Sequence, residues 1–418
     1  MSNSFIHRRH RPAFRPRLLA ALFLVAAVCA LLLGACTAAM QAELPEGQRS
    51  FQEYQRETLA KIRDSRDFQL PDRESELGWN GPREWRPTLS NAGERPTKAI
   101  LFVHGLGDSP WSFHDVGFAM AAEGYLVRTV LLPGHGTQPA DLLDVTAQQW
   151  RHLVREQARA LEKDVDGPVY LGGFSTGANL VLEYAYAHSS IAGLVLFSPG
   201  FKSMPFDWVA PMAAKVRPWI IGPSGSFPNQ TPVRYLNVPT NGYAQFYHTS
   251  VIARRLLERT YDKPVFMVVA QHDSVLDTDY LLDVFQRRFI HPDSRLIWYG
   301  TMPEQMMDSA RIHIREDRLP AYRISQFSHM GLMFSPQNPL YGSTGSLRIC
   351  LNGQTSAAAE ACKRGDPVWY SDWGYREEGK AHARLTYNPY FDWQTAIMVH
   401  TLEAQREARP ISPKHISR

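Results

Sequence analysis

The chain has 418 residues, of which 44% are hydrophobic and 21% are charged. This composition is typical of a globular protein with a sizeable core and excludes a disordered chain. The formal net charge is +4, but residues 1–35 hold five arginines and no acidic residue, so the remainder carries about −1. A nearly neutral remainder offers no basic surface for a phosphate backbone, which excludes nucleic-acid binding.

The N-terminal segment has the pattern of an export signal. Its arginines precede an apolar run, Leu18–Leu33, which small residues and Cys36 follow. These are the parts of a signal peptide, and the run is shorter than the ~20 residues of a spanning helix. Leu33-Gly34-Ala35-Cys36 resembles the lipobox of bacterial lipoproteins, which implies loss of residues 1–35, a lipid on Cys36 and a periplasmic or outer-membrane location. The alternatives are an uncleaved anchor and twin-arginine export through Arg8-Arg9, whose flanking histidines fit poorly.

Two other cysteines are expected to pair. Cys29 leaves with the signal and Cys36 carries the lipid, so Cys350 and Cys362 remain. An even pair in an oxidising compartment favours a disulfide, with two unpaired thiols as the alternative. The cysteines and histidines lack zinc-site spacing, so we expect no metal and no cofactor.

The order of apolar and amphipathic segments predicts an α/β fold. Residues 36–96 read as a polar lead-in, and residues 97–407 as one domain in which short apolar strands alternate with helices. The predicted strands are Ala99–Val103, Leu126–Leu132, Val169–Gly172, Leu194–Phe197, Val265–Ala270, Arg295–Tyr299 and Tyr322–Phe327. The predicted helices are Trp111–Ala122, Thr146–Leu161, Thr176–His188 and Trp393 to about Glu407. This pattern indicates a mostly parallel sheet covered on both faces, with ligands beyond the carboxyl ends of its strands.

Three segments interrupt the alternation. Residues 201–263 lie between strands, are rich in aromatic side chains and are expected to form a cap. Residues 334–392 are turn-rich and aromatic and contain the cysteine pair. Residues 301–320 read as an insertion with no assigned place, and residues 408–418 as a tail.

Ser175 is the predicted nucleophile. It lies in Gly173-Phe174-Ser175-Thr176-Gly177, between a predicted strand and a predicted helix. In that context the turn strains the serine backbone and requires small neighbours. The alternative is a serine that only caps the helix.

A serine hydroxyl needs a base, and the base needs an acid to orient it. Asp273 follows the strand Val265–Ala270 and is the predicted acid, whereas Asp277 and Asp279 suit a helix N-terminus. His329, in Phe327-Ser328-His329-Met330-Gly331, is the predicted base. Its rivals, His291 and His313, lie among charged residues, and a purely structural role for His329 is the alternative.

The backbone N–H groups of Leu106 and Thr176 are the predicted oxyanion hole. Leu106 lies in His104-Gly105-Leu106-Gly107, directly after the strand Ala99–Val103, and Thr176 follows the nucleophile. Enzymes with a nucleophilic serine between a strand and a helix take their two oxyanion donors from these places. A plain glycine turn after the strand is the alternative.

Together these motifs resemble the monoacylglycerol lipase and carboxylesterase branch of the α/β-hydrolases. The supporting stretches are His104–Ser109, Leu132-Pro133-Gly134-His135-Gly136, Gly173–Gly177 and Asp273–Leu276. The resemblance covers about residues 97–329 and implies a small cap and hydrolysis of carboxylic esters. The long segment after His329 and residues 301–320 depart from the family pattern and leave the substrate open.

The alternatives to ester hydrolysis are two other reactions on Ser175, Asp273 and His329, or a protein that catalyses no reaction. An aminopeptidase would need an acidic site for the substrate's ammonium, and an acyltransferase would differ only in the nucleophile that resolves the acyl-enzyme. A non-catalytic envelope lipoprotein is the alternative from another class. The aromatic cap and the lipid on Cys36 favour a lipid-type ester presented from a membrane, such as a monoacylglycerol or a lysophospholipid. The cap aromatics could equally serve only to pack the cap onto the sheet.

Overall fold

The structure is a computed structural model. It describes residues 49–88, 94–203, 205, 207–223, 228–308 and 310–407. The predicted signal segment with Cys36 and the tail 408–418 lie outside these residues. Among the residues described, no helix combines the length and the apolarity that crossing a membrane requires.

An eight-stranded sheet forms the centre of the fold, in the order β1-β3-β2-β4-β5-β6-β7-β8. Only β1 is antiparallel to its neighbour, β3, and the other neighbouring pairs are parallel. The strands are β1 Glu84–Trp85, β2 Ala99–Val103, β3 Leu126–Val130, β4 Val169–Phe174, β5 Ile191–Phe197, β6 Val265–Ala270, β7 Arg295–Tyr299 and β8 Ile312–Arg315. The predicted mostly parallel sheet is therefore confirmed.

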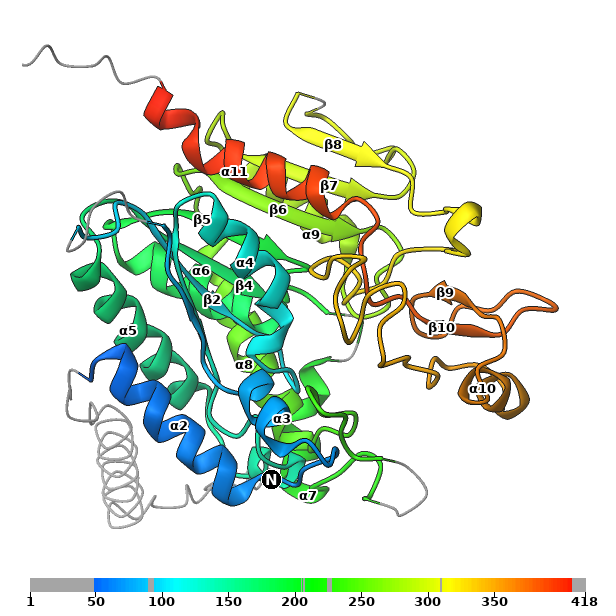
Figure 1. Ribbon diagram of the computed structural model, residues 1–418. Helices are drawn as coiled ribbons and strands as arrows, with labels where there is room; N and C mark the ends of the chain where they lie inside the picture. The colour runs from blue at the N-terminus through cyan, green and yellow to red at the C-terminus, as the bar shows by residue number, and fades with distance from the viewer. Residues whose placement is uncertain are drawn as a thin grey trace, which may run out of the picture. The chain divides into compact units, whose positions relative to one another are not determined.

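Helices cover both faces of the sheet because its strands are apolar on both sides. In β2, Leu101 and Val103 belong to one core, with α5, α6 and α9, whereas Ile100 and Phe102 belong to a second core, with α4 and α11. Figure 1 shows α4 and α11 together on one side. These helices are α4 His114–Ala122, α5 Ala147–Asp164, α6 Thr176–Ala187, α9 Thr278–Arg288 and α11 Phe391–Glu407. Single 3-10 turns occur at Pro110–Phe113, Pro139–Leu142, Asp207–Val209 and Pro320–Tyr322.

The lead-in contains two helices, α2 (Phe51–Ser65) and α3 (Arg73–Asn80), and is tied to the domain through Arg66. The Arg66 guanidinium is buried and pairs with Glu76 at 2.7 Å. It also donates to the carbonyl oxygens of Gly136 at 2.8 Å, Thr231 at 3.3 Å and Pro232 at 2.8 Å. Hydrogen bonds that involve a charged group are stronger than neutral ones, so Arg66 attaches the lead-in to residues 231–232, in the middle of the segment predicted as a cap.

The segment predicted as a cap, residues 201–263, follows β5 and precedes β6. Its helices are α7 (Ala210–Val216) and α8 (Thr240–Leu256). Helix α8 buries Ala244, Phe246 and Ala253, whereas α7 buries none of its residues. Trp208, Met212 and Val216, on and next to α7, are among the most exposed large apolar side chains of the described chain.

The last strand of the sheet differs from the prediction. Residues 322–327 are not a strand, and β8 (Ile312–Arg315) lies inside the segment 301–320 that the sequence left unplaced. Pro320 begins a 3-10 turn, and Arg323 has a left-handed φ of 54° that interrupts an extended chain. Ser325 is buried, and so are its apolar neighbours. The apolar–polar alternation of this run therefore does not reflect a strand with one buried and one exposed face.

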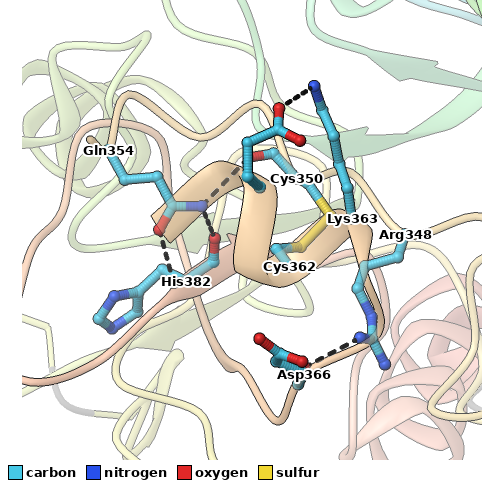
Figure 2. The surroundings of a disulfide bond; sticks show 8 residues. Arg348, Cys350, Gln354, Cys362, Lys363, Asp366 and His382 are labelled. Carbon is cyan, nitrogen blue, oxygen red and sulfur yellow. Dashed lines mark hydrogen bonds and ion pairs between the residues drawn. A yellow bond between two sulfur atoms is a disulfide. The ribbon is translucent and has the colours of Figure 1, made fainter. Parts of the chain in front are cut away.

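Residues 334–392 contain a small substructure with the predicted disulfide. Cys350 and Cys362 are joined, with Cα atoms 5.6 Å apart, which confirms their pairing. The bond links the chain before α10 (Ser356–Lys363) to the end of that helix, and the parallel strands β9 (Trp369–Ser371) and β10 (His382–Arg384) follow. Gln354 donates to the carbonyl oxygen of Cys350 and accepts from the N–H of His382, which connects the disulfide loop to β10 (Figure 2).

Candidate active site

Ser175 occupies a sharp turn between β4, in the middle of the sheet, and α6. Its φ of 51° and ψ of −114° lie outside the regions that a side chain ordinarily allows, and such strain is typical of functional sites. The flanking glycines are packed tightly, because an added Cβ would lie 2.5 Å from the Ala178 nitrogen at Gly173 and 1.9 Å from the Val103 oxygen at Gly177. The structure thus has the strained turn and the need for small neighbours that the sequence predicts.

Asp273 and His329 form a hydrogen-bonded pair. Asp273 lies in the turn after β6, and its Oδ2 is 2.6 Å from Nδ1 of His329. The other carboxylate oxygen accepts from the N–H groups of Val275 at 2.9 Å and Leu276 at 3.2 Å. The Asp273 side chain is fully buried and that of His329 is 10% exposed. A carboxylate that holds Nδ1 in this way fixes the ring orientation and leaves Nε2 to accept a proton.

Short contacts place Ser175 and His329 at the same end of the sheet. The Ser175 N–H donates to the carbonyl oxygen of Phe197 at 3.1 Å, and the Ser198 hydroxyl donates to the carbonyl oxygen of His329 at 3.2 Å. The rings of Phe174 and His329 have centroids 4.9 Å apart. Within the described chain the Ser175 hydroxyl is not hydrogen-bonded to His329, a contact that often tightens only when substrate is bound.

The loop after β2 faces Ser175. A Cβ added to Gly105 would lie 3.2 Å from the Cβ of Ser175. In the part of the chain that is described, the N–H groups of Leu106 and Thr176 donate to no other group, so both remain available to an oxyanion. Thr176 is the first residue of α6, and the free N–H groups and the dipole at a helix N-terminus favour negative charge.

His291 and His313, the rivals of His329, lie elsewhere. His291 accepts from the Asp293 N–H after α9, and His313 lies on the edge strand β8. Asp277 is the N-cap of α9 and accepts from the Tyr280 N–H at 2.9 Å, as its predicted helix-terminal position requires.

His135 and Tyr235 hold the predicted oxyanion loop, residues 104–109 after β2, and these contacts were not apparent from the sequence alone. Nε2 of His135 accepts from the Gly107 N–H at 3.0 Å, and the Tyr235 N–H donates to the Gly107 carbonyl oxygen at 2.6 Å. Burial lowers the pKa of His135 to about 4, so its imidazole is neutral at pH 7 and able to accept. The signal that could have found this role is the Pro133-Gly134-His135-Gly136 motif, which contributed only to the family resemblance.

Several known proteins are similar to this chain. A thermostable monoacylglycerol lipase from Bacillus sp. (strain H-257) is 33% identical over 116 residues, which are 27% of this chain and 46% of that protein. The chain therefore aligns with less than half of the length of this relative.

Similar solved structures include a soluble variant of the monoglyceride lipase of Saccharomyces cerevisiae and a monoacylglycerol lipase of Paleococcus ferrophilus. The yeast structure is 18% identical, with a TM-score of 0.40 and coverage of 52% of this chain and 82% of that one. The Paleococcus structure is 16% identical, with a TM-score of 0.41 and coverage of 52% and 87%.

The family comparison gives the broadest match. Residues 94–302, which are 209 of the 418 residues, match the family described as serine aminopeptidase, S33. The matched stretch includes Ser175 and Asp273 and ends before His329. With its mostly parallel sheet and its helices on both faces, the chain belongs to the serine aminopeptidase S33 family of α/β-hydrolases, in the branch that resembles monoacylglycerol lipases and esterases.

Proposed function

We propose that the protein is a serine hydrolase that cleaves carboxylic esters of lipid type, such as monoacylglycerols or lysophospholipids, through an acyl-enzyme on Ser175. The observation that carries the proposal is the 2.6 Å bond between His329 and the buried Asp273, at the sheet end where Ser175 occupies a strained turn. A weak nucleophile, an oriented base and its acid are the parts that acyl transfer needs.

In this mechanism Ser175 Oγ attacks the ester carbonyl while Nε2 of His329 takes its proton. The Asp273 carboxylate stabilises the imidazolium that forms. The N–H groups of Leu106 and Thr176 receive the developing oxyanion, a contribution typically worth about 3–4 kcal/mol for a single donor. His329 then gives its proton to the leaving alcohol, and a water molecule activated by the same histidine releases the acid.

The charges near the oxyanion loop favour an ester over a peptide with a free N-terminus. An aminopeptidase needs a carboxylate that is free to meet the substrate's ammonium. The acidic residue of this loop, Asp108, is buried, and burial raises its pKa, against the lowering effect of Arg234. Nε of Arg234 lies 4.0 Å from its Oδ1, so a cation already faces this carboxylate. An ammonium brought here would meet Arg234 as well as Asp108.

Apolar groups beside the site support a substrate with an acyl chain. A Cβ at Gly107 would lie 3.1 Å from Cγ2 of Val238, and one at Gly200 would lie 2.7 Å from Cε2 of Phe246 and 3.1 Å from the Ser175 carbonyl carbon. Val238 and Phe246 thus lie next to the oxyanion loop and the nucleophile. Each acyl CH₂ buried against such groups is worth about 0.8 kcal/mol.

The test is turnover of p-nitrophenyl esters against aminoacyl-naphthylamides, with protein truncated before Arg49. We expect ester turnover and labelling by a fluorophosphonate, and loss of both in Ser175→Ala. Ser190→Ala is the matched control, because Ser190 is exposed beyond the other end of α6 and, among the described residues, its hydroxyl bonds only Glu162. Ester turnover that persists in Ser175→Ala would show that the nucleophile is wrong. Turnover of the naphthylamides alone would favour an aminopeptidase. Transfer of the acyl group to an added alcohol in preference to water would favour an acyltransferase.

A series of esters of one alcohol tests the lipid class. We expect kcat/KM to rise from acetyl to about eight carbons, because each added CH₂ is buried before the transition state. A maximum at acetyl with a steady fall beyond it would contradict a lipid-type substrate and leave the esterase proposal intact.

We propose further that the protein is anchored to the bacterial cell envelope by a lipid on Cys36. The proposal rests on the signal-like sequence of residues 1–35 alone. Mass spectrometry of the N-terminal peptide from membranes is expected to find acylated Cys36 as the first residue. An unmodified Cys36 in a longer peptide would refute it.

A further inference from the structure

The turn that carries the acid is held from outside the family-matching stretch. The N–H of Ser274, the residue after Asp273, donates to Oδ2 of Asp372 at 2.5 Å. The other oxygen of Asp372 accepts from the Trp373 N–H at 2.7 Å. Asp372 is fully buried, so its carboxylate acts on the protein and not on solvent or substrate.

The loop that carries the base is held by the same part of the chain. Ser328, the residue before His329, donates its hydroxyl hydrogen to the carbonyl oxygen of Leu385 at 2.5 Å and accepts from the Gly331 N–H at 3.1 Å. Ser328 and Leu385 are both fully buried. The position of His329 along its loop is therefore set relative to Leu385.

The two holding residues belong to one small sheet. Asp372 follows β9 and Leu385 follows β10, and the two strands pair with Arg384 opposite Ser371. The Leu385 N–H donates to the Ser371 carbonyl oxygen at 2.9 Å, which continues the pairing past the strand ends. A shift of this sheet would move the acid turn and the base loop together.

The disulfide loop braces the sheet. Asn352, which lies between the two cysteines, donates to the Ser371 hydroxyl and to the Asp372 carbonyl oxygen, both at 3.1 Å. Its side-chain oxygen accepts from Nε of Arg384 at 2.7 Å. Together with the Gln354 contacts in Figure 2, these bonds connect the cross-linked loop to both strands.

The buried Asp372 carboxylate is balanced by a cation. Burial raises the pKa of Asp372, the Arg384 cation opposes this rise, and the negative charge of Asp273 adds to it. Nε of Arg384 is 3.8 Å from Oδ1 of Asp372. Burial lowers the pKa of Arg384 to about 10, so it stays cationic at neutral pH and offsets the second carboxylate.

We infer that the β9–β10 pair is a positioning element of the active site and that Asp372 is its positioning residue, which holds the Asp273 turn so that the carboxylate meets His329. The inference rests on the proposed function, since it concerns the same Ser175, Asp273 and His329. It assigns a catalytic purpose to the disulfide-bonded segment, which lies beyond the family-matching residues 94–302.

The test compares Asp372→Ala and Asp372→Asn with wild type, using a p-nitrophenyl ester, and counts active sites by fluorophosphonate titration. A misplacement of about 1 Å costs on the order of a hundredfold in rate, so we expect kcat per titrated site to fall roughly ten- to hundredfold. KM should change less than about twofold, because Asp372 is buried away from substrate. Asparagine offers one acceptor where Asp372 serves two N–H donors, so it should rescue the activity only in part.

The kcat per titrated site separates positioning from general loss of structure. Molecules that do not fold fail to react with the fluorophosphonate and are not counted, so a lower kcat per titrated site with little change in KM reports misplacement. Ser328→Ala removes the other contact without a change of charge, and should also lower kcat per titrated site. Asp366→Asn is the matched control, because Asp366 lies in the same segment and, within the described chain, its side chain pairs with Arg364 while its carbonyl oxygen accepts from Arg348.

The outcomes separate the inference from the proposed function. Asp372 variants with wild-type kcat per titrated site would overturn the inference, while wild-type turnover upholds the proposed function. Failure of the wild type to hydrolyse esters or to react with the fluorophosphonate would instead refute the proposed function. If Asp372→Ala does not fold, kcat per titrated site of Asp372→Asn and Ser328→Ala tests the inference in its place, and wild-type values in both would overturn it.

Discussion

Replacing Gly177 by alanine is expected to damage the active site without touching a catalytic side chain. Gly177 is the second residue of α6, and an added Cβ would lie 1.9 Å from the carbonyl oxygen of Val103 and 2.6 Å from that of His104. Both carbonyl oxygens are backbone atoms at the end of β2, so neither can rotate away from the added Cβ. The helix start and the oxyanion loop must therefore separate.

The size of the effect follows from that contact. Ordinary contact begins at 3.4 Å, so a Cβ at 1.9 Å requires a shift of about 1.5 Å, the difference between the two distances. A shift of this size moves the Thr176 N–H away from that of Leu106. We expect kcat/KM to fall on the order of a hundredfold and the free energy of unfolding to fall by about 1–3 kcal/mol.

The assay is ester turnover with urea-induced unfolding of the same protein. Gly78→Ala is the matched control, because Gly78 is exposed in α3 and an added Cβ meets nothing within 4 Å. Alanine there should leave turnover unchanged and stabilise the helix by about 0.5–1 kcal/mol. Turnover within threefold of wild type in Gly177→Ala would refute the steric reasoning.

Three further predictions concern the Asp273–His329 pair, the Cys350–Cys362 disulfide and the stability of the fold in acid. Asp273→Asn should lower kcat by on the order of 10⁴ with an unchanged circular dichroism spectrum, and a loss below tenfold would contradict the acid assignment. Joint replacement of Cys350 and Cys362 by serine should lower the free energy of unfolding in urea by about 3 kcal/mol, whereas equal stability would speak against the cross-link. Burial lowers the pKa of His135 from 6.5 to about 4, so the unfolded chain takes up its proton first as pH falls below 6.5. Stability should decline between pH 6.5 and 4, by up to about 3 kcal/mol from this histidine, and His135→Gln should flatten the decline in urea titrations.

Local patterns predicted the elements that position the nucleophile and the acid. The apolar runs of β2 and β6 fix those strands because each strand is buried on both faces. The tight turn at Ser175 was predicted from the glycines on either side, and the close approach of Gly177 to Val103 requires one of them. The catalytic roles of these residues stay predictions until the variants are measured.

Other features depend on contacts that no local pattern records. The alternating run 322–327 looked like a strand, but the left-handed Arg323 and the buried, paired Ser325 belong to a turn. No sequence pattern pointed to Asp372, because its proposed positioning role depends on a hydrogen bond to Ser274, which is 98 positions away in the chain. His135 was visible as a motif, but its hydrogen bond to Gly107 becomes apparent only in three dimensions.

The bonds of Arg66 bear on which part of residues 201–263 opens most readily. Any opening of the segment near Thr231 and Pro232 would break charge-assisted hydrogen bonds and leave a buried cation short of partners, which is costly. Helix α7, which precedes Thr231 in the same segment, buries none of its residues, and elements with few buried contacts open at the least free-energy cost. Opening this segment near α7 should therefore cost less free energy than opening it near Thr231 and Pro232.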